Sequence, residues 1–211
     1  MITIIDYKAG NLTSVRLAFE ALGAEARITA DPAEIRRASR IVFPGVGAAG
    51  AAMQTLRAAG LDDVIRERIA AGTPFLGICL GTQILFGRSE EDGGVATLGL
   101  LPGEVVKFQQ SAISNQQSAI IKIPHMGWNQ AHQSRPHPLL DGIPDGSDFY
   151  FVHSYHTVPA DDALVICRTD YCGVRFASMV GRGNVAATQF HPEKSGAVGL
   201  RVLSNFIKWK I

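Results

Sequence analysis

One cysteine, Cys79, stands between two glycines in the segment GICLG, residues 77–81, directly after an apolar run. A cysteine that only packs in a core needs no such neighbours. A nucleophile on a sharp strand-to-helix turn does, because small flanking residues let the backbone cross closely and take up strained angles. Residues 80–87 predict a helix whose N-terminal dipole favours a thiolate and whose first amide, the Leu80 N–H, can serve as an oxyanion donor. A buried structural cysteine is the alternative.

His191 and Glu193 can complete a nucleophilic site, because a cysteine nucleophile needs a base and the base needs an orienting group. Both lie in TQFHPEKS, residues 188–195, at the end of an apolar run. In an extended chain, residues two apart point to the same face, about 7 Å apart at the backbone. Pro192 between them disfavours a helix, which would separate the side chains. The tripeptide His191-Pro192-Glu193 is a weak signal by itself, and it indicates a catalytic site only together with Cys79.

A third segment, PGVG at residues 44–47, is expected at the carboxyl end of a strand, where ligands bind in open α/β sheets. Its glycines allow a backbone amide to turn toward a developing oxyanion, which makes Val46 and Gly47 candidate donors. The alternatives are an ordinary strand-to-helix loop and a phosphate cradle. The segment matches neither dinucleotide-binding nor Walker A patterns.

No metal or cofactor site is expected. Cys167 and Cys172 have no second pair of ligands, so they do not form a zinc pattern. His153 and His156 lack a supporting set of carboxylates, so we expect them to be structural or to line a substrate site.

Strands and helices alternate over the first hundred residues, which predicts an α/β fold with a parallel sheet covered on both faces. The expected strands are 1–7, 24–29, 39–45 and 73–78, and the expected helices are 11–23, a short one after Asp31-Pro32, 51–60 and 61–72.

Short strands dominate after about residue 100 and predict an antiparallel or mixed extension of the sheet. They are expected at 104–108, 119–124, 148–155, 163–169, 173–180 and 184–190, before an amphipathic helix at 197–210. We expect residues 1–211 to form one domain. A tandem repeat, QQSAISN followed by QQSAI at 109–120, predicts a flexible inserted surface loop, with an active-site lid as the alternative.

The composition is that of a soluble globular protein. The chain has 211 residues, 46% of them hydrophobic and 18% charged, with a formal net charge of +1. This balance gives no indication of a nucleic-acid or membrane-surface partner. Three cysteines do not suggest a disulfide framework, and the N-terminus has no signal-peptide pattern, so a reduced, cytoplasmic location is expected.

Taken together, PGVG, GICLGTQ and QFHPEKS resemble the class I, triad-type glutamine amidotransferases. Within them, PHMGWN at 124–129, FYFVHSYH at 149–156 and HPEKS at 191–195 resemble the glutaminase subunit of imidazole glycerol phosphate synthase, of histidine biosynthesis. The resemblance runs nearly end to end. It departs from the family at Thr82, where methionine is usual, and at the repeat, which lengthens a loop.

This resemblance implies a flavodoxin-like fold and a glutaminase mechanism. A Cys79 thiolate would attack the side-chain amide of glutamine, His191 would transfer protons, and Glu193 would fix the imidazole. The resemblance also assigns further roles: Val46, Gly47 and Leu80 would supply the oxyanion hole, and Gln83, Glu91, Ser154 and Tyr155 would bind the amino-acid end of glutamine.

The resemblance also implies a partner. The family passes ammonia to a separate (βα)8-barrel synthase, which makes imidazole glycerol phosphate and an aminoimidazole carboxamide ribotide, so a heterodimer is expected. The residues that face the synthase would be Asn11, Trp128, Tyr150 and Lys194. A core position for Trp128 is the alternative.

The presence of Val46 predicts that the oxyanion hole is not always formed. A β-branched residue resists positive φ, so turning a loop amide into a productive oxyanion hole costs free energy here. We hypothesise that the free subunit rests with this donor turned away and that the loaded partner shifts the population. Two other functions remain open: an amidotransferase subunit of another pathway, such as aminodeoxychorismate or pyridoxal phosphate synthesis, and a non-catalytic paralogue.

Overall fold

A computed structural model of the protein describes residues 1–8, 10–109 and 122–211. Nearly all of the tandem repeat, residues 110–120, lies outside the described residues, so the expected surface loop stays a prediction.

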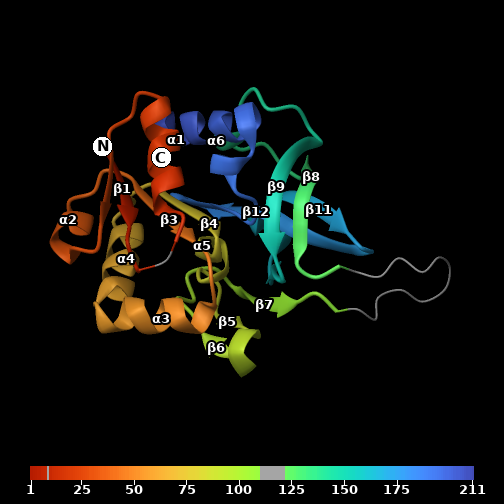
Figure 1. The fold of residues 1–211 in the computed structure, drawn as a ribbon, viewed down its shortest axis with the longest axis horizontal. Coiled ribbons are helices and arrows are strands. Elements are labelled where there is room, and N and C mark those ends of the chain that lie inside the picture. The colour runs from red at the N-terminus through yellow and green to blue at the C-terminus, as the bar shows by residue number, and fades with distance from the viewer. Residues whose placement is uncertain (9, 110–121) are drawn as a thin grey trace.

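Five parallel strands form one end of the sheet, in the order β2-β1-β3-β4-β13 with β2 at the edge (Figure 1). They are β1 (Ile2–Ile5), β2 (Ala26–Thr29), β3 (Ile41–Gly45), β4 (Phe75–Cys79) and β13 (Val185–Thr188). The strands β1, β3, β4 and β13 are buried along their whole length, as expected for strands covered on both faces.

Helices cover both faces of this sheet, as predicted. Because side chains alternate along a strand, Val42 packs with α1 and α6 whereas its neighbours Ile41 and Phe43 pack with α2, α3 and α4. The helices are α1 (Leu12–Ala21), α2 (Pro32–Arg36), α3 (Ala49–Ala58), α4 (Leu61–Ala70) and α6 (Gly196–Lys208). Asp31 caps α2 through the Ala33 N–H at 2.8 Å.

The predicted antiparallel extension is also present. β12 pairs antiparallel with β13, and β10 and β7 continue the sheet to the short strands β5 and β6. β11 pairs with β12 and β8, and β8 pairs with β9. Their bounds are β5 (Arg88–Ser89), β6 (Val95–Ala96), β7 (Gly103–Lys107), β8 (His125–Gln133), β9 (Ser147–His153), β10 (Tyr155–Pro159), β11 (Val165–Tyr171) and β12 (Val174–Arg182).

Two predicted strands are wrong in detail. The strand expected at 148–155 is two strands, because β9 ends at His153 and β10 begins at Tyr155. Of the strand expected at 119–124, the described residues 122–124 are not in a strand, and the chain instead enters β8 at His125.

The helix predicted at 80–87 is only one turn long, α5 (Leu80–Gln83). The helix ends after one turn because backbone N–H groups of another loop take the place of those that a further helical turn would supply. The carbonyls of Ile84, Leu85 and Phe86 accept hydrogen bonds from backbone N–H groups of residues 98–101 instead of from a following helical turn. A dipole argument based on a long helix at Cys79 is therefore weaker than the sequence suggested.

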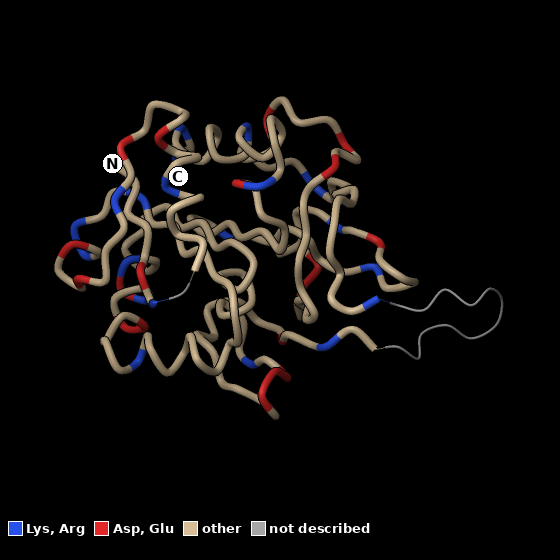
Figure 2. Tube along the Cα trace, in the orientation of Figure 1, with Lys and Arg blue, Asp and Glu red and all other residues tan. Residues whose placement is uncertain are grey.

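Charges of both signs are spread over the molecule, and an acidic stretch at residues 90–92 lies beside β5 and β6 (Figure 2). Among the described residues, no helix is both long and apolar enough to cross a membrane.

Candidate active site

Cys79 ends β4 in a strained conformation. Its φ of 54° and ψ of −104° lie outside the regions that L-residues favour. The neighbouring glycines are required by close approach: a Cβ on Gly77 would stand 2.6 Å from the Gly81 carbonyl oxygen, and one on Gly81 would collide with the Phe43 carbonyl oxygen. The sharp turn predicted from the sequence is confirmed, and such strain is typical of functional sites.

Three strand ends bring the predicted segments together at one edge of the sheet. Gly45, at the end of β3, pairs with Cys79, and Thr188, at the end of β13, pairs with Ile78. The chain from β13 leads within three residues to His191. The loop after β3, the cysteine and the histidine therefore meet at the carboxyl edge, where open α/β sheets bind ligands.

His191 and Glu193 are in contact, although not through an extended chain. A 3-10 helix, η5 (Pro192–Lys194), follows His191, so the prediction that Pro192 keeps this segment extended is wrong. The turn still brings His191 Nδ1 to 2.9 Å from Glu193 Oε1. Both side chains are buried, with 2% and 0% of their area exposed, so the pair is protected from solvent screening.

The structure also anchors this pair from two sides. Asn11 Nδ2 donates to Glu193 Oε1 at 2.8 Å, and the His191 N–H donates to the Tyr150 carbonyl at 2.9 Å. Asn11 was predicted at the partner interface. The described contacts place its side chain against Glu193, where it can orient the carboxylate.

The pKa of His191 indicates a charged imidazole. Burial lowers this pKa, but the interactions with Cys79 and Glu193 outweigh burial and raise it to about 10. Within the described residues, His191 Nε2 is buried and makes no hydrogen bond of normal geometry. The nitrogen is thus near enough to the sulfur to be coupled to it, and it is not engaged by the rest of the fold.

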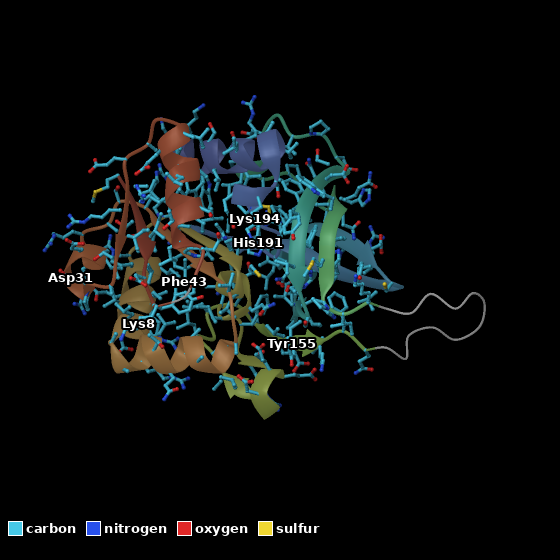
Figure 3. All side chains as sticks on the ribbon, in the orientation of Figure 1. Lys8, Asp31, Phe43, Tyr155, His191 and Lys194 are labelled. Atoms are coloured by element: carbon cyan, nitrogen blue, oxygen red, sulfur yellow. The ribbon has the colours of Figure 1, made fainter. Side chains whose placement is uncertain are left out.

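A cavity of about 320 Å³ opens above Cys79 and has the size of a small-molecule site. It brings together all the residues predicted for the oxyanion hole and for glutamine binding. These lining residues are Val46, Gly47, Leu80, Gln83, Glu91, Ser154 and Tyr155, joined by Pro124, Val152 and His153. In Figure 3, His191 lies beneath α6 and Tyr155 lies farther down, near β7.

Gln83 is positioned by two contacts at the cavity wall. Its Nε2 donates to the Tyr155 carbonyl at 2.9 Å and to Gln189 Oε1 at 3.2 Å. Gln189 in turn points its Nε2 at Cys79 Sγ, 3.7 Å away. Gln189 lies in the segment TQFHPEKS, but no role was predicted for it from the sequence. Its side chain thus contacts both Cys79 and Gln83.

Glu91 reaches the cavity from the acidic stretch. Its Oε2 accepts the Ala49 N–H at 2.6 Å, at the beginning of α3. Burial raises the pKa of Glu91, and the bond from Ala49 works against that increase. The carboxylate therefore lines the cavity with one oxygen held by the α3 backbone.

A pair of buried histidines, His125 and His153, supports the Ser154–Tyr155 backbone. His153 Nδ1 lies 2.8 Å from the Tyr155 carbonyl, so this nitrogen carries the proton, and His153 Nε2 accepts from His125 Nδ1 at 2.9 Å. Burial lowers the pKa to about 3 for His153 and about 4 for His125, which keeps both neutral. His153 was predicted as structural or substrate-lining; it holds the Tyr155 backbone and lines the cavity, and His125 was missed.

The loop after β3, residues 46–48, is the predicted oxyanion loop. It does not present the Val46 amide to the cavity in this conformation. The Val46 N–H donates to Tyr7 Oη at 3.0 Å, and Tyr7 Oη donates to the Val46 carbonyl at 3.2 Å. Positive φ occurs at Gly47 (95°) and not at Val46. Sequence reasoning missed Tyr7, and no pattern in the chain marks it.

Three of the predicted interface residues gather on the β8–β9 surface. Trp128 pairs with Tyr150 in register, their rings 6.1 Å apart, and Lys194 Nζ lies 5.8 Å from the centre of the Tyr150 ring. Trp128 is 58% exposed, so the alternative of a core position is wrong.

The described residues contain no group of three or more His, Cys, Asp or Glu side chains placed to hold a metal ion. Comparison with known families gives a match to the glutamine amidotransferase class-I model over residues 3–209. The chain belongs to this family. A nucleophilic cysteine beside a buried His–Glu pair is the arrangement that class-I amidotransferase chemistry needs.

Several curated relatives of this class-I amidotransferase carry the name imidazole glycerol phosphate synthase subunit HisH. Those from Aromatoleum aromaticum and Nitrosococcus oceani are each 51% identical over 210 residues, covering 99% of this chain and 98% and 97% of the relatives. Among solved structures, a protein titled glutamine amidotransferase has a TM-score of 0.74 at 18% identity, covering 99% of this chain and 98% of the other. PurLQS from Thermotoga maritima has a TM-score of 0.73 at 20% identity, covering 98% and 97%. These structures show a common fold.

Proposed function

We propose that this chain is the glutaminase subunit of an imidazole glycerol phosphate synthase. It hydrolyses L-glutamine to glutamate and passes the ammonia to a separate synthase subunit in the cytoplasm. The observation that carries the proposal is the match along nearly the whole chain, at about half identity, to relatives of that name. The residues that line the cavity above Cys79 carry the groups that glutamine hydrolysis needs.

In the first half of the reaction, the Cys79 sulfur attacks the carbon of the glutamine side-chain amide. The carbonyl π electrons move to oxygen, and backbone amides stabilise the oxyanion, with Leu80 N–H as one donor. When the C–N bond breaks, the imidazolium of His191 gives its proton to the leaving nitrogen, so ammonia departs and a thioester remains. A pKa raised to about 10 keeps His191 protonated for this role.

In the second half, neutral His191 takes a proton from water as the water oxygen attacks the thioester carbon. The C–S bond then breaks, glutamate is released and the Cys79 thiolate returns beside the imidazolium. Glu193 holds the Nδ1 proton of His191 throughout, which leaves Nε2 to exchange protons with the reacting groups.

The amino-acid end of glutamine has matching groups on the cavity wall. The carboxylate of Glu91 suits the substrate ammonium, and the backbone at Ser154 and Tyr155 suits the substrate carboxylate. Gln83 holds this wall through the Tyr155 carbonyl. The surface formed by Trp128, Tyr150 and Lys194 is proposed to dock the synthase, since aromatic side chains such as Trp128 and Tyr150 are enriched in interface cores.

The test is glutaminase activity of the purified chain, measured alone and then with a histidine-pathway synthase subunit plus its ribotide substrate. We expect low activity alone and a large increase in the complex. Cys79→Ala should abolish both, while the matched control Cys172→Ser, at a distant turn, should keep them. An electrophilic glutamine analogue should label Cys79 and neither other cysteine.

Complementation of a histidine auxotroph that lacks its glutaminase subunit separates the proposal from its alternatives. Growth supports the histidine pathway. An active glutaminase that fails to complement and is not activated by the synthase would indicate another ammonia-using pathway, and an inactive, unlabelled chain would indicate a non-catalytic paralogue.

A further inference from the structure

Tyr7 has a fixed position beside the oxyanion loop. It lies two residues beyond the end of β1, is 5% exposed, and stacks on Phe43 of β3 with ring centroids 4.7 Å apart and planes 17° apart. Phe43 packs in the core between β3 and α3 (Figure 3). The Tyr7 hydroxyl also packs against Gly45, where an added Cβ would stand 2.7 Å from the oxygen. Ring and hydroxyl therefore have little freedom to move.

The hydroxyl holds both polar groups of Val46. It accepts the Val46 N–H at 3.0 Å and donates to the Val46 carbonyl at 3.2 Å. Burial, chiefly, raises the pKa of Tyr7, so the hydroxyl keeps the proton that it donates. Because these groups belong to the two peptide units on either side of Val46, neither unit can rotate without breaking a bond to Tyr7.

This contact bears on the nucleophile because of strand register. Gly45 pairs with Cys79, so the Val46 N–H is the first loop donor beyond β3 at the level of the sulfur. While it donates to Tyr7, it cannot donate to an oxyanion on the cavity side. Val46 and Gly47 line both the cavity above Cys79 and a second depression, and Tyr7 lines the second depression.

We propose that Tyr7 is a positioning residue that holds the Val46 peptide in the resting orientation of the oxyanion loop, through two hydrogen bonds that must break before the oxyanion hole is complete. The inference rests on the proposed glutaminase function and adds the residue that keeps the free chain slow. A synthase partner activates the chain by favouring the state in which this contact is released.

The test is Tyr7→Phe, which removes one oxygen atom and keeps the stacked ring. A net hydrogen bond shifts an equilibrium by about two- to tenfold, so we expect kcat of the free chain to increase about tenfold. KM for glutamine should stay unchanged, because an oxyanion donor acts in the transition state and not in substrate binding. The kcat in the partner complex should stay within about twofold of wild type, so the activation ratio falls.

Tyr171→Phe is the matched control, since it also removes a hydroxyl that donates to a backbone carbonyl, that of Lys122, at 2.7 Å. It should leave the free-chain kcat unchanged. Hydrogen exchange of the Val46 amide, followed in a ¹⁵N-valine-labelled chain, gives a readout independent of activity: it should become faster in Tyr7→Phe and not in Tyr171→Phe.

An unchanged or lowered free-chain kcat in Tyr7→Phe, with Val46 exchange unchanged, overturns the inference. Failure of the proposed function is separate, because it would appear in wild type, as no activation by the histidine-pathway synthase. In that case Val46 exchange and basal glutaminase activity still decide whether Tyr7 holds the loop.

Discussion

At the scale of single residues, the charge of the site depends on His191, whose raised pKa opposes the effect of its own burial. Removing the sulfur with Cys79→Ala leaves Glu193 to favour the charged form of the imidazole. We expect the pKa of His191 to decrease by at least about one unit, observed by NMR titration of the imidazole nitrogens. Cys167→Ala, which removes a buried thiol on β11, is the control and should leave the titration unchanged. An unchanged pKa in Cys79→Ala would show that the sulfur carries no charge there.

The same residue makes stability depend on pH. A folded-state pKa of about 10 against an ordinary value of 6.5 means that the folded protein holds a proton that the unfolded chain releases. The stabilisation is complete below pH 6.5 and is lost as pH increases toward 10. The contribution of His191 to the free energy of unfolding should therefore fall by up to about 1.4 kcal/mol per pH unit in this window, as part of the slope measured by urea denaturation. The slope should be smaller in Cys79→Ala, and an equal slope would contradict the coupling.

Asn11 connects the beginning of α1 to the triad. Its backbone is left-handed, with φ of 73°, and its side chain donates to Glu193. Glycine accepts this φ without steric cost, so Asn11→Gly removes only the hydrogen bond. We expect kcat of the synthase complex to fall about tenfold with KM unchanged, because Glu193 then holds His191 less firmly. Asn11→Ala should lose the same activity and also melt at a lower temperature; wild-type kcat in both variants would show that Asn11 has no positioning role.

At the scale of elements, the turn between β4 and α5 depends on the absence of side chains. A Cβ on Gly81 would collide with the Phe43 carbonyl oxygen, and β3 lies too deep in the core to move. We expect Gly81→Ala to cost about 2 kcal/mol or more of unfolding free energy and to abolish glutaminase activity. Gly87→Ala is the control, because its Cβ would meet the nearest atom, the Gly103 carbonyl oxygen, at an ordinary 3.5 Å. Urea denaturation of both variants measures the difference, and equal costs would show that crowding at Gly81 is relieved by small shifts.

Elements with strong local signals were predictable from the sequence. The Asp31 cap, the buried parallel strands and the glycine-flanked turn at Cys79 all follow from short-range rules. Elements whose limits are set by distant partners were not. The helix after Cys79 ends after one turn because residues 98–101 supply donors from elsewhere in the chain, which no local pattern reveals.

The candidate site divides in the same way. Cys79, His191 and Glu193 stand in recognisable segments, and the fold brings those segments to one sheet edge. Tyr7 contacts the backbone of Val46, 39 positions away in the chain. His125 reaches the backbone of Tyr155, 30 positions away, through His153. Their side chains carry no spacing signal because their partners are main-chain groups.

At the scale of the whole molecule, the site connects directly to an exposed surface. β9 contributes Tyr150 to that surface, while the Tyr150 carbonyl accepts the His191 N–H. The Tyr150 backbone is also held at its N–H, which donates to Ser195 Oγ at 3.0 Å. Ser195 Oγ in turn donates to the His191 carbonyl at 2.6 Å. A protein bound to Trp128 and Tyr150 would therefore contact the strand whose backbone holds His191.

Trp128 is the side chain on which this docking can be tested. It is 58% exposed in the free chain, so truncation should hardly change the melting temperature. A buried aromatic anchor at an interface contributes about 2 kcal/mol or more, so Trp128→Ala should weaken binding to the synthase about 30-fold, measured by calorimetric titration. Val158→Ala, at an exposed position on β10, is the control and should bind as wild type does. Unchanged affinity in Trp128→Ala would move the docking surface away from β8 and β9, and with it the route by which a bound synthase reaches His191.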